Sequence, residues 1–372
     1  MIKFILKIFL VGLLLVVVVV AGISIYMKFY GNKLIEKQLS QILGTKMKFD
    51  GISLDLKKYS VNFTGFSIPS EVGFEARTVF NADRFVLVLD KEKFDRDKKF
   101  VIKEAIVEKG TFNIERNKQG VFNVSCLPKS EEPAAGPGVA YAAETEGNAP
   151  IPFYNFAKSV KRVLIKKSMV NFRDYYISKE PLSVTCANFY TDIRMSPEEE
   201  ASRGAIPMKY EVSFDIPRRG ATGQFSLHGE AAIHRDRVDT EASMDTKNID
   251  MMQFLPYFRK ATPFYFYEGE FNSTTSIAIH NKAVKSTTTM LFYRLKLEAD
   301  PEKRNASFLQ VSVDKLVPYL TSGKGEVIFD FEINGPLEHP EAGLGPKVKM
   351  AIGAVVVDEF GKILQQLQKM NK

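Results

Sequence analysis

The sequence contains no tryptophan, and its 372 residues include only two cysteines and four histidines. So few thiol and imidazole groups argue against a zinc or iron–sulfur protein, which would need several of them. The HExxH, Walker-type, GxGxxG and GxSxG patterns are also missing, so metal-dependent, phosphate-binding and acyl-transfer chemistry have no support. We therefore expect a protein with no catalytic residues, no metal site and no cofactor, which is not an enzyme.

Charge of one sign does not dominate the sequence either. The chain has 51 basic and 44 acidic residues, and its net charge is +7. The two signs are interleaved, which argues against a nucleic-acid-binding protein. Phenylalanine, in contrast, is abundant, with 29 residues.

An uncharged apolar run extends from Ile8 to Met27 near the N-terminus. At ~1.5 Å per residue, this run matches the ~30 Å hydrocarbon core of a bilayer. A cleaved signal peptide is the alternative, but the run is longer than a usual signal core and no clear A-x-A site follows it. We predict an uncleaved, single-pass membrane anchor within residues 1–30, with the bulk of the chain on the far side of the membrane from the short N-terminal tail.

Helical spacing of apolar residues occurs at the two ends of the remaining chain. Residues 32–43 predict a short helix that ends at Gly44. Residues 351–372 predict an amphipathic helix, with an apolar stripe that includes Phe360 and Leu364. We interpret the second helix as a cap on one end of a sheet, rather than as an interfacial membrane helix, because few lysines occupy its polar side.

Between residues 45 and 345, apolar residues recur with a period of two, which is typical of strands with one apolar and one polar face. About fifteen such segments are separated by turn residues, and no amphipathic helix of useful length lies between them, which excludes an α/β fold. We predict a mostly β fold, in which a single transmembrane helix precedes one antiparallel-rich domain over residues 31–350.

The apolar face of such a sheet has to be covered by a second sheet, by closure into a barrel, or by folding lengthwise into a trough. About fifteen strands at ~4.8 Å make a sheet ~70 Å long, and open sheets rarely exceed ~10 strands without curling or splitting. We expect a curled sheet whose apolar face lines the inside of a groove. The candidates for lining it are Phe214, Ile216, Phe225, Leu227, Ile277, Ile279, Leu295, Leu297, Val327, Phe329, Phe331 and Ile333.

The sequence also contains an internal repeat: residues 106–114 (IVEKGTFNI) resemble residues 164–172 (LIKKSMVNF). A second predicted strand follows each copy and ends at Cys126 or Cys186. Neighbouring strands could bring these cysteines within disulfide distance in an extracytoplasmic compartment, and two free buried thiols are the equal alternative. Between the copies, the Pro-, Ala- and Gly-rich residues 128–152 predict a disordered insertion in one domain.

Several segments resemble the AsmA-like proteins of Gram-negative envelopes, a family that includes TamB-type proteins. The similarity begins with GISLDLKKYSVNFTGFSIPSEVGF after the anchor and continues with NADRFVLVLDKEKF. Further along, NIDMMQFLPYFRKATPFYFYEGEF is similar to a helix-then-hairpin element of the family around Leu255, Pro256 and Tyr257. Finally, GKGEVIFDFEINGPLEHPE is similar to its closing block. The chain departs from the family in its short length and in the insertion at 128–152.

This resemblance implies an inner-membrane anchor and a periplasmic, taco-shaped β-groove that holds or moves phospholipid for envelope and outer-membrane maintenance. Its partners would be an acyl-chain lipid, the inner membrane and an envelope protein. The residues leave a rival function open, a structural or assembly factor for outer-membrane proteins whose sheet is filled by its own side chains and acts through edge strands.

Overall fold

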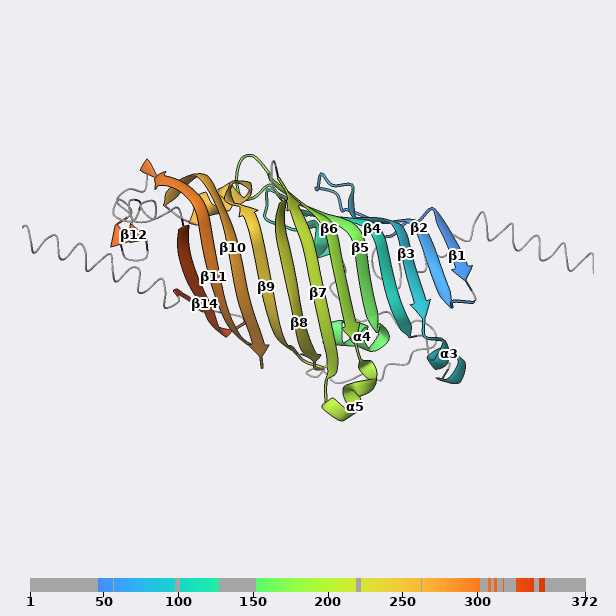
Figure 1. Ribbon diagram of the computed structural model, residues 1–372. Helices are drawn as coiled ribbons and strands as arrows, with labels where there is room; N and C mark the ends of the chain where they lie inside the picture. The colour runs from blue at the N-terminus through green and yellow to red at the C-terminus, as the bar shows by residue number, and fades with distance from the viewer. Residues whose placement is uncertain are drawn as a thin grey trace, which may run out of the picture.

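Strands of alternating polarity build one large, open sheet in the computed structural model of the protein (Figure 1). The structure describes residues 46–55, 57–97, 101–126, 152–218, 222–261 and 263–301, followed by 307–308, 311–312, 317, 326–337 and 341–344. The predicted anchor, both predicted terminal helices and all of the predicted insertion except Pro152 lie outside these residues.

Within the described residues, thirteen strands form the main sheet, and their order follows the chain from β1 to β11 and continues with β14 and β15. Consecutive neighbours are antiparallel, apart from the parallel pair β4 and β5. A mostly β, antiparallel-rich sheet is therefore confirmed. The strands are β1 (Gly51–Asp55), β2 (Ser60–Pro69), β3 (Thr78–Leu89), β4 (Ile102–Arg116), β5 (Arg162–Asp174), β6 (Leu182–Met195), β7 (Ile206–Pro217), β8 (Thr222–Ile233), β9 (Val238–Asp250), β10 (Phe264–His280), β11 (Ala283–Ala299), β14 (Glu326–Pro336) and β15 (Glu341–Leu344).

The remaining elements are short. A separate pair of strands is formed by β12 (Ser307–Phe308) and β13 (Val311–Ser312). No helix among the described residues has both the length and the apolar composition of a membrane span. The α-helices are α3 (Lys91–Asp97), α4 (Pro152–Ser159), α5 (Glu200–Arg203) and α6 (Leu255–Ala261), and the 3₁₀ turns are η2 (Asn123–Cys126), η3 (Pro197–Glu199) and η4 (Met251–Phe254).

The internal repeat forms the parallel pair at β4 and β5. The two copies lie side by side in register, so that Ile106 is opposite Leu164 and Ile114 is opposite Phe172. The second strand predicted for the first copy is wrong: after an isolated bridge between Arg116 and Phe122, the chain turns into η2. The corresponding segment of the second copy is the start of β6. The chain leaves the sheet after β4 and re-enters from the opposite strand end through α4, which is why the two copies are parallel.

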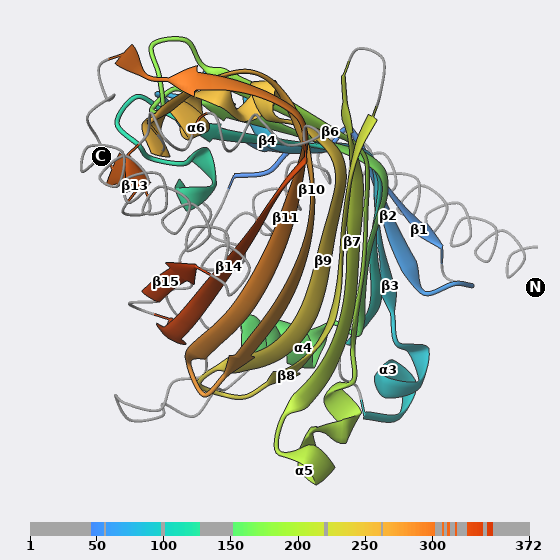
Figure 2. The same ribbon diagram turned by 60° about the vertical axis from the view of Figure 1, so that its left-hand side comes forward.

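Backbone bulges bend the sheet. Six strands each contain one residue with a left-handed backbone, at φ between 51° and 59°: Gly65, Lys109, Lys167, Asn188, Asn248 and Arg294. Such bulges bend a strand and shift its inward–outward alternation by one residue. For this reason Phe292 and Leu295, three residues apart, belong to the same apolar cluster. In profile, the strands curve so that one broad face of the sheet is concave (Figure 2).

Candidate functional site

A continuous row of phenylalanine rings crosses the concave face. It runs from β2 to β8, with neighbouring ring centroids between 4.4 and 6.4 Å apart. Six strand spacings of ~4.8 Å make it ~29 Å long. Two of its rings are buried and six are half-buried, so the row forms both core and surface. The members of this phenylalanine row are Phe63, Phe66, Phe80, Phe85, Phe112, Phe189, Phe214 and Phe225.

Helix α4 bounds the row at one end of the strands. Its Tyr154 and Ala157 pack against Ile206 and Met208 of β7 and Ile233 of β8 in one buried cluster. Ala157, Ile206 and Ile233 have no exposed surface. The helix therefore occupies the concave face at the strand end from which β5 and β7 start (Figure 2).

The segment formed by η4 and α6 bounds the row at the opposite strand end. It connects β9 to β10, but Tyr257 of α6 reaches back to Asp174 at the end of β5, 83 residues away in sequence. On the way, Phe254 and Tyr257 pack against Val184 of β6 and Ile216 of β7. The segment thus crosses the concave ends of β6 to β9, and the phenylalanine row lies between this strap and α4.

A buried carboxylate holds the strap in place. Asp174 is fully buried and accepts hydrogen bonds from the Tyr257 hydroxyl and from the backbone N–H groups of Tyr176 and Ile177, at 2.8 and 3.2 Å. The Arg116 guanidinium lies 3.6 Å from Oδ2 of Asp174, the oxygen that also accepts the Tyr257 hydroxyl. Burial and the bond to Asp174 raise the pKa of Tyr257 to about 12, so the tyrosine stays a neutral donor.

Between the two strand ends, the described strands β4 to β11 present no charged side chain to the concave face, and the ion pair of Asp174 and Arg116 lies at one strand end, beneath the strap. On β7, for example, Tyr210, Val212 and Phe214 face inward, while Lys209 and Glu211 alternate with them on the outer face. Cross-strand pairing repeats this division on every neighbouring strand, because paired residues share a face. Where the bulges shift the alternation, Lys109 and Lys167 are turned outward and stay exposed.

The outer face carries many charged side chains, and several of them form ion pairs across neighbouring strands. Asp192 of β6 accepts hydrogen bonds from Arg162 of β5 at 2.8 and 2.9 Å and from Arg194 at 2.7 Å. The bond from Arg162 lowers the pKa of Asp192. One step along the sheet, Glu108 of β4 lies 2.7 Å from Lys166. These pairs make this part of the outer face suited to contact with water.

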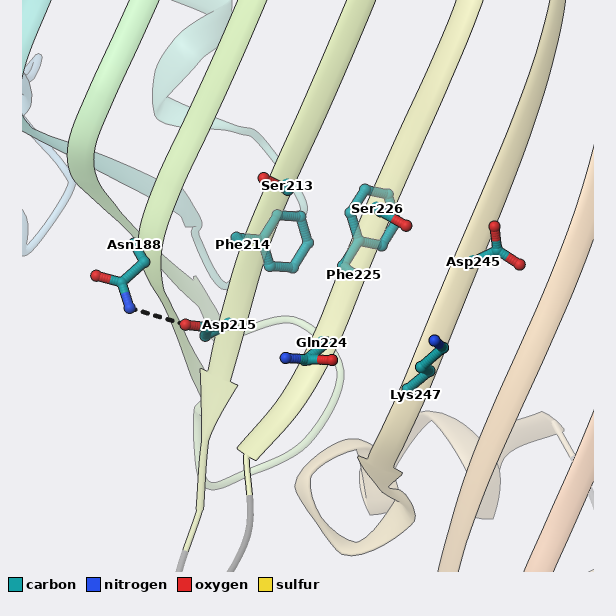
Figure 3. A pocket seen from close by; sticks show the side chains of 9 residues that line it. All are labelled: Asn188, Ser213, Phe214, Asp215, Gln224, Phe225, Ser226, Asp245 and Lys247. Atoms are coloured by element: carbon teal, nitrogen blue, oxygen red, sulfur yellow. Dashed lines mark hydrogen bonds between the residues drawn. The ribbon is translucent and has the colours of Figure 1, made fainter.

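Figure 3 shows a shallow cavity of about 360 Å³ on the outer face of β7 to β9. Polar side chains, among them Gln224, Asp245 and Lys247, line it on the strands that also carry Phe214 and Phe225. Asn188 donates a hydrogen bond of 2.8 Å to Asp215 at its edge, and Asp245 accepts one of 2.9 Å from Thr274. Its carboxylates thus have partners from neighbouring strands.

Most of the residues predicted to line a groove lie on one face of the sheet. Phe214, Ile216, Phe225, Leu227, Ile277 and Ile279 share the concave face by register. Leu295 and Leu297 reach the same side through the bulge at Arg294 and are buried with Phe264 and Phe266. In β14 the register places Val327, Phe329, Phe331 and Ile333 on this face; the side chain of Ile333 is 38% exposed, and those of the other three lie outside the described part.

The cysteines do not form the disulfide that was one of the two alternatives. Cys186 is a free, half-buried thiol beside Val170 of β5, and burial raises its pKa to about 11. Cys126 ends η2 instead of lying in a strand, and its side chain is outside the described residues. The free thiol at Cys186 is therefore part of the apolar cluster under the strap.

Six of the eight rings in the row were not among the residues predicted to line the groove, and only Phe214 and Phe225 were. Phe63, Phe112 and Phe189 lie at most three positions from the bulges at Gly65, Lys109 and Asn188, where strict alternation breaks down. The sequence signals for these rings were the high phenylalanine content and the internal repeat. In the folded sheet, Phe112 of the first repeat copy lies between Phe80 and Phe189.

Compared with models of known protein families, the chain matches none, and no curated protein is significantly similar to it.

Proposed function

We propose that this protein binds acyl lipids on its concave face and, anchored in the inner membrane, passes or holds them in the periplasm for envelope maintenance, without catalysis. The observation that carries this proposal is a row of eight phenylalanines that crosses the concave face between α4 at one strand end and the strap at the other. Each CH₂ group that it keeps from water contributes ~0.8 kcal/mol. A charged side chain on the path would cancel several such contributions.

The size of the row supports an acyl chain as the ligand. One leaflet of a bilayer is about half of the ~30 Å hydrocarbon core, so an acyl chain covers ~15 Å. The ~29 Å row can hold about two such chains end to end. The strap and α4 keep the chains from leaving along the strand direction, which favours movement across the strands, along the row.

Lipid extraction from the purified full-length protein tests the proposal. We expect roughly one or more phospholipids per chain, measured by mass spectrometry after extensive washing in detergent. A truncated chain that ends at residue 45, and so keeps only the predicted anchor, is the control for lipid bound by the anchor itself. Equal amounts of lipid on both chains would contradict the proposal and favour a structural or assembly role.

A further inference from the structure

The phenylalanine row ends at a band of hydroxyl groups on the same concave face. Phe225, its last ring, is opposite Thr246 of β9, and Thr246 is opposite Ser273 of β10. Two residues after Ser273 on β10, Thr275 faces the same side of the sheet and is opposite Thr288 of β11. We call Thr246, Ser273, Thr275 and Thr288 the hydroxyl band. An apolar surface that continues across seven strands thus changes to hydroxyls within one strand spacing.

The four hydroxyls are bonded to each other in pairs. The Oγ atoms of Thr246 and Ser273 are 2.8 Å apart, and those of Thr275 and Thr288 are 3.0 Å apart. Ser273 and Thr275 are buried, whereas Thr246 and Thr288 are half-buried. The buried member of each pair therefore holds the more exposed member in position.

Each pair keeps one proton for another acceptor. A hydroxyl has one proton to donate, and one bond between two hydroxyls uses one of their two protons. Among the described residues, these four hydroxyls form no further side-chain hydrogen bond. Leaving a donor without an acceptor at a water-poor site costs free energy, so the band is suited to a ligand that brings acceptor oxygens.

The ligand group at this band should be uncharged. The inward positions of β7 to β11 hold no lysine, arginine, aspartate or glutamate, and the nearest charges, Asp245 and Lys247, belong to the outer face. A phosphate would lose its hydration there without gaining a cation. A carbonyl oxygen of an acyl ester needs only a hydrogen-bond donor.

We propose that the hydroxyl band binds the ester carbonyls of a glycerolipid while its acyl chains lie on the phenylalanine row, an inference that rests on the proposed lipid-binding function. The protein then recognises the linkage between chain and glycerol and leaves the charged headgroup outside. The band also stops an acyl chain at β8, because sliding further would place CH₂ groups over unpaired hydroxyl protons.

Competition between two lipids tests this inference on the full-length protein. The probes are the diester and diether forms of phosphatidylglycerol with identical chains, each competing with a fluorescent phospholipid. We expect the wild-type protein to bind the diester form roughly 2- to 10-fold more tightly, the effect of one neutral hydrogen bond. Phosphatidylethanolamine diester should bind as well as phosphatidylglycerol diester.

The Thr275→Val/Thr288→Val variant removes both members of one pair, which leaves no single hydroxyl unpaired and preserves shape. It should show a smaller preference for the diester than the wild type, because only the Thr246–Ser273 pair still has a proton to donate, and it should bind the diether as the wild type does. The matched control, Ser276→Val/Thr287→Val, changes an exposed cross-strand pair of the outer face and should keep the preference. Equal binding of both linkages by the wild type, or a preference that follows headgroup charge, would overturn the inference while leaving lipid binding intact. Absence of any lipid binding would instead refute the proposed function.

Discussion

Replacing Phe225 by glutamate should lower the amount of bound lipid by at least about tenfold. Phe225 stacks on Phe214 with ring centroids 4.4 Å apart and an angle of 10° between the rings, in the half-buried part of the row. The inward positions of the neighbouring strands β7 and β9 hold no cation for a carboxylate at this position, so bound hydrocarbon would have to desolvate an unpaired charge. A loss of only ~1.4 kcal/mol already reduces affinity tenfold. The measurement is lipid retained per chain, by mass spectrometry of the full-length protein.

The neighbouring residue provides the control for this change. Gln224 precedes Phe225 on β8 but faces outward, is exposed, and lies opposite Lys247. Gln224→Glu adds the same charge one residue away, beside a cation, and should bind lipid as the wild type does. Circular dichroism of Phe225→Glu checks that the sheet is still formed, and Phe225→Leu, which keeps an apolar side chain, should retain most of the lipid. Equal losses in Gln224→Glu and Phe225→Glu would refute a face-specific site.

Replacing Asp174 by alanine should destabilise the protein by about 3–5 kcal/mol, the cost of breaking a buried ion pair. The change removes the acceptor of the Tyr257 hydroxyl and of two backbone N–H groups, and it leaves Arg116 without its buried partner. Since this carboxylate ties α6 to β5, the strap should loosen first. Urea unfolding of the full-length protein, followed by circular dichroism, measures the change.

Two further variants test whether the loss of stability comes from the contact between Asp174 and the strap or from the removal of any carboxylate. Tyr257→Phe removes one hydrogen bond and should cost about 1 kcal/mol. Asp236→Ala removes an exposed carboxylate whose partner is the neighbouring Arg237, at 3.3 Å, and should change stability by less than about 0.5 kcal/mol. If Asp174→Ala unfolded at the same urea concentration as Asp236→Ala, the strap would not depend on Asp174.

Alternation of apolar and polar residues predicts the central strands well. β7 and β8 are long, regular and free of bulges, so Phe214, Ile216, Phe225 and Leu227 fall on the expected face. β9 supplied no candidate for the groove lining, because several of its inward residues are small or polar, such as Ala242 and Thr246. Strands of this kind are specified by their neighbours rather than by their own pattern.

The curvature and the boundaries of the site could not be predicted from local sequence. Lys109 and Lys167 adopt left-handed backbones that their residue type does not favour, and only the register of the folded sheet requires a bulge there. The contact of Tyr257 with Asp174 joins residues 83 positions apart and leaves no local signal. The repeat was detectable, but whether its copies pair in parallel depends on the segment that connects them.

Photo-crosslinking in cells tests most directly whether acyl chains lie on the concave face. A photoreactive amino acid is placed at Leu227, which faces inward beside Met244, or at Ser226, the adjacent exposed residue of the outer face. The account predicts lipid adducts, identified by mass spectrometry, at position 227 and none at position 226. Lipid adducts at position 226 equal to those at 227, or none at 227, would contradict it.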